Sequence, residues 1–424
     1  MKTQNVEITT LEDGLRIVTQ KADFNNVFIG AWIKVGLVNE SDEENGLSHF
    51  LEHMVFKGTE TKTALELSDY IEKLGGECNA YTSTEETVIH TSVLPEYWKF
   101  GVDFLADVIQ NSTFPKYEIE RERNVIMQEI AMYENDQGSE MYNQALSNMY
   151  SGDPMGRTIL GPRSNIQRFT RDDLVAYYNK WYTPDNIVIS ACGDIDHEEF
   201  VNYVKEQFRL NFRSSDKPEI KSSLFKVNES RKQNIFSQSQ FLLTAEGPNF
   251  KNSDDKDRLT FQLLWNIIDG GMSCRLFQEI REKHGLAYHV SLSVNCTEST
   301  GFFGVYAALE ESNIEKAIAL SKQVLESAKY DIKEEELEKA KNSILYGLAR
   351  KYDSCSSIAT SNAQRTMFNL GYKDYNEIKE IIEEITMDDV IKCANKYIPN
   401  TDENRYSLSV MTPYETLVEK EQHE

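Results

Sequence analysis

The feature of this sequence that most restricts its fold is a repeat at a constant separation. Residues 170–193 read TRDDLVAYYNKWYTPDNIVISACG, and residues 386–411 read TMDDVIKCANKYIPNTDENRYSLSVM. The shared Thr, Asp, Asp, Asn and Lys positions all have the same offset, 386 − 170 = 216, which is close to half of the chain length. A helix–strand unit that recurs over this distance is typical of an internal duplication. We therefore predict two homologous domains, each ending in this unit.

The length and composition of the chain agree with two folded domains. A chain of 424 residues exceeds one ordinary core, so two domains of about 200 residues are expected. We place the first domain at 1–212 and its homologue at 233–424, with a polar linker at 213–232 that is rich in Ser, Lys and Glu. Hydrophobic residues make up 40% of the chain, as in globular proteins.

The charge of the chain restricts its partners. A formal net charge of −24 argues against nucleic acid, because a phosphate backbone would be repelled. An acidic cavity attracts basic peptides, which makes them the expected partners. The alternative is that the acidic surface serves solubility alone.

The sequence predicts a cytoplasmic protein. Residues 1–7 lack both the apolar stretch of a signal peptide and the Arg-rich pattern of a transit peptide, and no segment has the length of a membrane span. The six cysteines are scattered without a C-x-x-C pair, so we interpret them as reduced thiols.

The segment His49-Phe50-Leu51-Glu52-His53 carries the strongest chemical signal. On a helix, His49 and His53 lie one turn apart on the same face. Two imidazoles at this spacing can hold one zinc ion, and Glu52 beside them can act as a general base. This order of residues is the inverted motif H-x-x-E-H. The alternative is a pair of histidines beside an apolar core, but the pattern arises by chance in a chain of this composition only about 0.02 times.

A zinc site with two histidines needs a third protein ligand, which leaves the fourth position for water. The predicted helix at 117–133 places Glu122 and Glu129 two turns apart on one face. Glu129 is the candidate for the third ligand, although one downstream Glu among many is a weak signal. The apolar positions of this helix do not share one face, so we expect it to be covered on more than one side.

The second half of the chain does not repeat the histidine pair. A shift by the offset of the repeat brings His49 to Trp265 and His53 to Asp269. One half is therefore expected to be catalytic, and the other to have a different task.

Residues 270–288 of the second half include two polar side chains of interest, Arg281 and Tyr288. Such groups can hold a peptide carbonyl or stabilise an oxyanion. The more common alternative is that both are ordinary surface residues.

A peptide-binding strand is expected near the motif. Residues 77–94 are rich in Thr, Val, Tyr and Ile and are interpreted as one long strand region. Near its start lie Asn79, Ala80, Tyr81 and Thr82, whose small and polar side chains suit an edge strand that pairs with an extended peptide. The alternative is an ordinary sheet strand.

The remaining pattern of the first domain mixes strands and helices. A turn at Asp13-Gly14 predicts a hairpin. The motif helix is expected to begin at Asn45 or Ser48 and to end near Gly58. Further strands and helices are predicted at 6–11, 15–19, 27–38, 63–74 and 97–110.

These residues resemble a known family, the pitrilysin-type (inverzincin) zinc metallopeptidases. The motif at 49–53 is followed by Glu129 at a separation similar to that of the family, 129 − 53 = 76. The resemblance covers nearly the whole chain and is closest to the short branch, which includes mitochondrial processing peptidase and its bacterial relatives. The other matching words are Gly46-Leu47-Ser48, Phe56-Lys57-Gly58-Thr59, Gly75-Gly76, Asn79-Ala80-Tyr81-Thr82, Gly161, Arg275-Leu276-Phe277 and Gly285-Leu286-Ala287-Tyr288.

The resemblance implies a role for each residue of the motif. His49, His53 and Glu129 would bind one zinc ion per chain. Glu52 would be the general base, and Glu122 would orient one of the ligands.

The resemblance also implies an architecture and an assembly. The expected fold class is α+β, with two homologous domains that each pack helices on a mostly antiparallel sheet and together form half of a clamshell. A homodimer would complete the shell around the peptide. Arg281 and Tyr288 would then grip the substrate at the partner chain's zinc.

The function expected from these observations is a zinc-dependent endopeptidase that hydrolyses peptides or presequence-like segments bound in an extended form inside an enclosed chamber. The main alternative is a catalytically idle peptide-binding or scaffold subunit of the same fold, which would usually have lost a ligand or the base. A further alternative is a chaperone-like binder with structural zinc, for which four protein ligands would be expected.

Overall fold

The computed structural model describes residues 5–209 and 223–414 of the protein. The chain forms two compact units, each built from segments of both halves of the sequence. The first unit comprises residues 1–133, 157–222 and 346–380, and the second comprises 134–156, 223–345 and 381–424.

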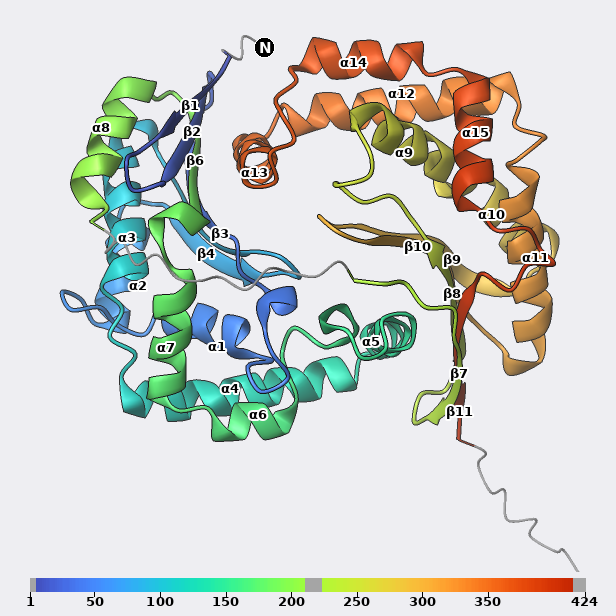
Figure 1. Ribbon diagram of the computed structural model, residues 1–424, viewed down its shortest axis with the longest axis horizontal. Helices are drawn as coiled ribbons and strands as arrows, with labels where there is room; N and C mark the ends of the chain where they lie inside the picture. The colour runs from blue at the N-terminus through green and yellow to red at the C-terminus, as the bar shows by residue number, and fades with distance from the viewer. Residues whose placement is uncertain (1–4, 210–222, 415–424) are drawn as a thin grey trace, which may run out of the picture. The chain divides into compact units, whose positions relative to one another are not determined.

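The first unit is built on a six-stranded sheet (Figure 1). Its strands are β1 (Val6–Thr10), β2 (Arg16–Lys21), β3 (Val27–Ile33), β4 (Glu77–Thr82), β5 (Thr87–Val93) and β6 (Ile187–Gly193). They lie in the order β1-β2-β6-β3-β5-β4, and all neighbours are antiparallel except β2 and β6. The fully buried strands β3 and β6 lie at its centre, and β4 lies at one edge. The hairpin predicted around Asp13-Gly14 is confirmed as β1 and β2.

Helices cover both faces of the first sheet. They are α1 (Leu47–Met54), α2 (Ala64–Glu72), α3 (Trp98–Gln110), α4 (Lys116–Glu134), α6 (Arg163–Arg168), α7 (Arg171–Trp181), α8 (His197–Gln207) and α13 (Cys355–Met367). Alternate strand residues point to opposite faces. Ile17 and Ile189 belong to the core that includes α1 and α3, whereas their neighbours Val18 and Val188 pack with α13.

The second unit contains a five-stranded sheet and its own helices. The strands are β7 (Glu229–Asn234), β8 (Ser239–Glu246), β9 (Ala287–Cys296), β10 (Gly301–Leu309) and β11 (Ser407–Pro413). Their order is β7-β11-β8-β10-β9, with β7 and β11 parallel and the other pairs antiparallel. The helices are α5 (Gln137–Met149), α9 (Asp255–Asp269), α10 (Arg275–Phe277), α11 (Ile314–Ser327) and α15 (Met387–Tyr397), while α12 (Glu334–Lys351) and α14 (Tyr375–Glu384) contribute residues to both units.

The strand orders confirm the predicted α+β fold with an internal duplication. The order β2-β6-β3-β5-β4 in the first sheet matches β7-β11-β8-β10-β9 in the second, and the parallel pair occupies the same place in both. The repeated unit is also the same. Helices α7 and α15 begin with capping boxes at Thr170 and Thr386, which explains why Thr and Asp recur in the sequence.

One pair of duplicated helices is exchanged between the halves. Shifting the bounds of α5 by the offset of the repeat gives 353–365, which nearly coincides with α13 at Cys355–Met367. Yet α5 packs on β11 and β8 of the second sheet, and α13 packs on β6, β3 and β2 of the first. The compact units therefore differ from the predicted domains 1–212 and 233–424 by these segments. Those boundaries stay a prediction about the duplicated halves.

Two strand predictions need correction. Residues 77–94 do not form one long strand, because the chain turns at Ser83–Glu86 and returns as β5. The strand predicted at 27–38 ends at Ile33 and is followed by a short 3-10 turn at Leu37–Asn39. The predicted linker at 213–232 lies outside the described residues up to 222, and its last four residues already belong to β7.

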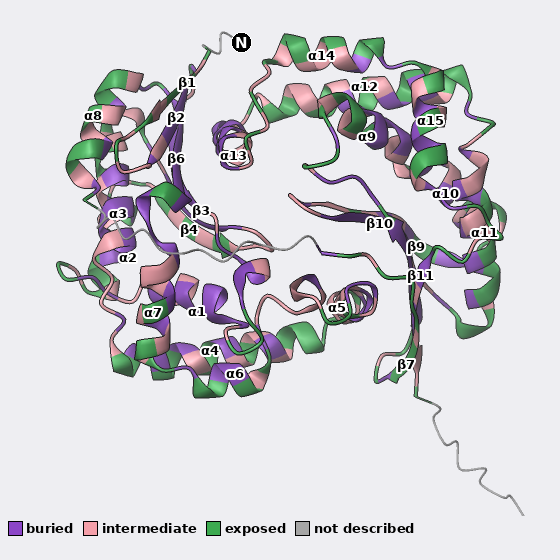
Figure 2. Ribbon diagram, in the orientation of Figure 1, coloured by how far each residue is buried: buried purple, intermediate pink, exposed green. Residues whose placement is uncertain are grey.

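The coverage predicted for the helix at 117–133 is wrong. Helix α4 buries one stripe that contains Ile119, Ile126 and Ile130, but Val125 is 47% and Met132 is 60% exposed. Figure 2 shows the exposed surface along α4. The apolar residues outside the stripe therefore face solvent and do not indicate a second covered side.

Two further findings bear on the environment of the protein. None of the helices within residues 5–209 and 223–414 is long and apolar enough to cross a membrane. The six cysteines all lie in the described part of the chain, and none of them forms a disulfide.

Candidate metal centre

The helix that carries the histidine pair is held at its N-terminus by a buried carboxylate. Glu40 accepts hydrogen bonds from the backbone N–H groups of Gly46, at 2.9 Å, and Ser48, at 2.7 Å. These are the donors that a helix leaves unpaired at its start. Burial raises the pKa of Glu40 to about 7, against the effect of hydrogen bonds from Asn45, Ser48 and Gly46. Helix α1 follows Gly46, so the predicted side-chain caps at Asn45 and Ser48 are wrong.

Gly46 is suited to this place by its backbone, with φ at +104°. A side chain is strained in this conformation. Phe50, Leu51 and Met54 are fully buried in the core of the first unit. The start and the apolar face of α1 thus fix the direction of the remaining face, which carries the two histidines.

The structure brings three predicted ligands together. The Nε2 atoms of His49 and His53 each lie 3.5 Å from Oε2 of Glu129, which comes from α4. One ligand atom from each residue lies within 4.8 Å of the others. Bonds of about 2.0–2.2 Å to a tetrahedral zinc ion place neighbouring ligand atoms about 3.3–3.6 Å apart. The donor set and the two distances from the histidines to Glu129 therefore fit zinc.

Outside these three residues, Glu122 orients one imidazole. Its Oε2 lies 3.0 Å from Nδ1 of His53, and its Oε1 lies 2.8 Å from Nζ of Lys57. A carboxylate on the far nitrogen of a histidine fixes the tautomer that leaves Nε2 for a metal. Burial alone would raise the pKa of Glu122. Hydrogen bonds from His53 and Lys57 have the larger combined effect, so the pKa of Glu122 lies below its ordinary value.

The two histidines differ in their electrostatic environment. Burial and the charge of His53 lower the pKa of His49 to about 4. Burial also acts to lower the pKa of His53, but hydrogen bonds with Glu122 and Glu129 raise it to about 9. The Nδ1 of His49 is buried and has no hydrogen-bond partner within the described residues. His53 thus lies against two carboxylates, whereas His49, in the part of the chain that the structure describes, lies against that of Glu129 alone.

Glu52 lies beside the cluster with one defined hydrogen bond. Its Oε2 accepts from Oγ1 of Thr82 at 2.7 Å, and Thr82 is the last residue of β4. Burial raises the pKa of Glu52, although the hydroxyl of Thr82 lowers it in part. A carboxylate whose pKa is shifted toward neutrality is better suited to exchange protons with a substrate.

The strand that contains Asn79, Ala80, Tyr81 and Thr82 lies at the edge of the first sheet. Asn79 and Tyr81 are exposed, whereas Ala80 and Thr82 point toward the face that carries α1. The outer side of β4 has no neighbouring strand within the described residues. Such an edge offers backbone groups to an added strand. Its role in substrate binding stays a prediction.

Arg281 and Tyr288 lie in the second unit and contact each other. Arg281 belongs to a π-helical turn at Gln278–Lys283, an irregularity frequent at functional sites. Its guanidinium donates to the carbonyl oxygen of Tyr288 at 3.0 Å and lies 4.6 Å from the centre of the Tyr288 ring. The side chain of Tyr288 is 81% exposed. Tyr288 is therefore accessible to a ligand, and Arg281 is partly exposed beside it.

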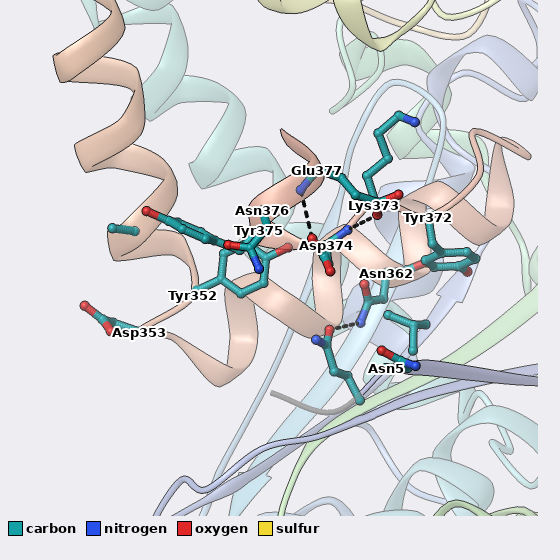
Figure 3. A pocket seen from close by; sticks show the side chains of 13 residues that line it. Asn5, Tyr352, Asp353, Asn362, Tyr372, Lys373, Asp374, Tyr375, Asn376 and Glu377 are labelled. Atoms are coloured by element: carbon teal, nitrogen blue, oxygen red, sulfur yellow. Dashed lines mark hydrogen bonds between the residues drawn. The ribbon is translucent and has the colours of Figure 1, made fainter. Parts of the chain in front are cut away.

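A polar cavity of about 720 Å³ in the first unit lies apart from the cluster formed by His49, His53 and Glu129 (Figure 3). Its lining includes Asn362, Tyr352 and Tyr372 from the α12–α14 segment and Asn5 at the start of the described chain. Asn362 donates to Gln20 of β2 at 2.9 Å. None of the cluster residues lines this cavity.

Sequence reasoning missed three contacts around the cluster. Lys57 lies beyond the end of α1, so helical spacing does not predict its contact with Glu122. The contact between Thr82 and Glu52 joins segments 30 residues apart, and no local pattern reveals it. No local pattern reveals the contacts of Glu40 either, because this residue lies in the loop before the helix whose backbone N–H groups it binds.

Comparisons with known proteins agree with this geometry. A family model described as "Insulinase (Peptidase family M16)" matches residues 16–163, and one described as "Peptidase M16 inactive domain" matches residues 168–344. An "Uncharacterized zinc protease" of Rickettsia felis is 34% identical over 395 residues, which cover 93% of this chain and 95% of that protein. The chain belongs to peptidase family M16.

Other relatives extend the M16 comparison. A "Probable mitochondrial-processing peptidase subunit beta, mitochondrial" of Arabidopsis thaliana is 32% identical, over 97% of this chain and 79% of that protein. A solved protease from Helicobacter pylori has the same fold, with a TM-score of 0.88 at 21% identity over 96% of this chain and 100% of that chain. The predicted family is therefore confirmed.

The division between the two M16 family models follows the duplication. The model for residues 16–163 contains the histidine pair and Glu129. The model whose description includes the word "inactive" covers 168–344, where the shifted motif positions are Trp265 and Asp269. The two halves of this M16 chain therefore differ in the residues that could bind a metal.

Proposed function

We propose that this chain is a zinc-dependent endopeptidase that cleaves peptides bound in an extended conformation. The observation that carries the proposal is the cluster of His49, His53 and Glu129, whose ligand atoms lie within 4.8 Å of one another next to Glu52. The family relationship supports it, because relatives of this chain are named zinc proteases.

In the proposed mechanism, His49, His53 and Glu129 hold the zinc ion. When bound, zinc supplies a Lewis acid that polarises a carbonyl oxygen and makes water more acidic. Glu52 Oε2 is engaged by Thr82, which leaves Oε1 to accept a proton from the attacking water. The same oxygen then delivers the proton to the leaving amine. Glu122 keeps His53 in the tautomer that this arrangement needs.

The substrate would be positioned by the edge strand. An extended peptide that adds to β4 satisfies the backbone groups of that edge, and its side chains alternate between the two faces of the sheet. Thr82 ends this strand and contacts Glu52, so a peptide bond paired near Thr82 lies close to the base. The net charge of −24 favours basic peptides, and a cytoplasmic location is proposed from cysteines that are scattered along the chain without a C-x-x-C pair.

Cleavage of a fluorogenic basic peptide by the purified chain tests the proposal. We expect cleavage to stop after chelation and to return when zinc is added, because the three ligands and the base are all present. The same treatment with magnesium in place of zinc is the control, since imidazole ligands suit zinc. If neither this peptide nor a broad peptide library is cleaved by the zinc-loaded protein, the chain is an idle peptide-binding or scaffold subunit instead.

We also propose that two chains form a homodimer with an enclosed chamber, in which Arg281 and Tyr288 of one chain act at the zinc of the other. Support comes from the resemblance in sequence and from the exposed side chain of Tyr288, whose carbonyl oxygen accepts a hydrogen bond from Arg281. A C2 dimer would place both sites in equivalent surroundings.

Mixing of two inactive variants tests the shared site. Random exchange between Glu52→Gln and Arg281→Ala chains makes half of the dimers mixed, and each mixed dimer has one intact site out of two, so about a quarter of the wild-type activity is expected. Glu52→Gln mixed with His49→Ala is the matched control and should recover nothing, because both changes damage the same half of the chain. Confirmed mixed dimers of the first pair without activity would exclude sharing.

A further inference from the structure

Helix α13 comes from the second half of the sequence but forms part of the first unit. It buries Ile358, Ala359 and Ala363 against strand residues that include Trp32 and Val188. These strand side chains point away from the core that contains α1. Helix α13 therefore covers the face of the sheet opposite the cluster of His49, His53 and Glu129. Seen from that cluster, the helix lies behind the edge strand β4.

A hydrogen-bonded chain joins α13 to that edge strand. Nε2 of Gln364 donates to Oε1 of Glu86 at 2.9 Å, and the hydroxyl of Tyr81 donates to the same oxygen at 3.3 Å. Glu86 is only 4% exposed, and its Oε2 has no partner within the described residues. Burial raises the pKa of Glu86, against the effect of both donors. Burying a carboxyl group with so few partners lowers the free energy of unfolding, so the place of Glu86 in the structure needs an explanation.

Glu86 also closes the turn between β4 and β5. Its carbonyl oxygen accepts from the backbone N–H of Ser83 at 2.8 Å and from the Ser83 hydroxyl at 3.1 Å. Tyr81 and Thr82 precede this turn directly, and Thr82 contacts Glu52. The end of the edge strand nearest the proposed base is thus fixed through Glu86.

A cavity of about 690 Å³ separates the rest of α13 from the back of the edge strand. Asn79 and Tyr81 line it from β4, and Ser356 and Thr360 line it from α13. The packing between the helix and the strand is therefore incomplete here. Gln364 and Glu86 do not line this cavity, and their hydrogen bonds connect the helix directly to Tyr81 of the strand.

We propose that Gln364 and Glu86 are positioning residues for the peptide-binding strand. By holding Tyr81 and the turn, they keep β4 in the conformation with which an extended peptide pairs. The inference rests on the proposed function, because it assumes that β4 binds the substrate. The hydrogen bonds of these two side chains run to each other and to Tyr81, away from Glu52 and the metal cluster, so their loss should weaken peptide binding and leave the chemical step intact.

An exchange of the two side chains tests this proposal. Gln364→Glu places a second carboxyl group against Glu86, and we expect KM for the fluorogenic peptide to rise roughly tenfold with kcat within about twofold. Glu86→Gln alone should change little, because its amide oxygen can still accept from both donors. The double variant should recover most of the affinity, since the amide nitrogen at 86 can take the place of Oε1 and donate one hydrogen to the carboxylate at 364 and the other to the hydroxyl oxygen of Tyr81.

Two further measurements separate positioning from a loss of folding. Ser361→Glu adds the same charge to α13 beside Lys351 and should leave KM unchanged. Hydrogen exchange of residues 77–86 should become faster in Gln364→Glu and return to the wild-type rate in the double variant, at an unchanged melting temperature.

The exchange measurement does not depend on catalysis. If the wild-type protein cleaves no peptide, the proposed function fails, while faster exchange in Gln364→Glu that the double variant reverses still supports the connection. Unchanged exchange at residues 77–86, or an unchanged KM in a folded Gln364→Glu protein, overturns the positioning role. A raised KM that Glu86→Gln does not rescue also overturns it, because the effect would then not arise from this pair.

Discussion

Glu52→Gln is expected to lower kcat/KM for peptide cleavage by about 10²–10⁴-fold, the usual contribution of a general base. The amide oxygen of glutamine can still accept the hydrogen bond from Thr82, which is 2.7 Å long in the wild type. The side chain should therefore keep its place, but an amide cannot take a proton from water. The substitution therefore removes the proton acceptor and preserves the position of the side chain.

Zinc content distinguishes this explanation from a loss of the site. Glu52 is not among the three residues whose ligand atoms converge, so the variant should bind as much zinc as the wild type, measured by mass spectrometry of the metal. Glu60→Gln, at an exposed position beyond the motif helix, is the matched control and should be fully active. Normal turnover in a zinc-loaded Glu52→Gln protein would remove Glu52 from the role of base.

Glu129→Ala is expected to weaken zinc binding by more than about 100-fold, because even the outer partners of metal ligands are worth about 10–100-fold. Its Oε2 is the atom that lies 3.5 Å from both histidine nitrogens. Without it, the cluster keeps only two ligands from the same helix. Cleavage should disappear together with the metal, and zinc at concentrations that saturate the wild type should not restore it.

A neighbouring residue provides the control for this effect. Gln128 is exposed on the same helix, so Gln128→Ala should keep both zinc and activity. Zinc titration with a competing chelator measures both variants on one scale. Full occupancy of Glu129→Ala would mean that another residue completes the site.

Helical periodicity explains why the histidine pair could be recognised from the sequence. Residues four apart on a helix share a face whatever the rest of the fold does, so His49 and His53 needed only a helix, and the structure shows their rings 4.7 Å apart. The same reasoning paired Glu122 with Glu129 on α4. The meeting of α1 with α4 is different, because it depends on the packing of two helices that are distant in the sequence. The sequence named Glu129 as a candidate on weak grounds, and the resemblance to a family gave that prediction its weight.

Local patterns failed where a strand or helix took its role from distant contacts. The turn at Ser83–Glu86 is short and polar and lies between two segments of strand composition, which were interpreted together as one strand region. The exposed Val125 and Met132 of α4 were interpreted as a second buried face, because the sequence does not show whether an apolar residue is buried or exposed.

The sequence by itself determined the duplication, the helix that carries the histidine pair and the family, since each depends on spacing along the chain. The tertiary structure decided which segments meet. It placed β4 at a sheet edge, set Thr82 against Glu52, and exchanged α5 and α13 between the two sheets. The physical reason is that a helix satisfies its backbone hydrogen bonds locally, whereas a strand needs a neighbouring strand, and the apolar face of either can be buried against any complementary surface. Which surface that is depends on the whole chain.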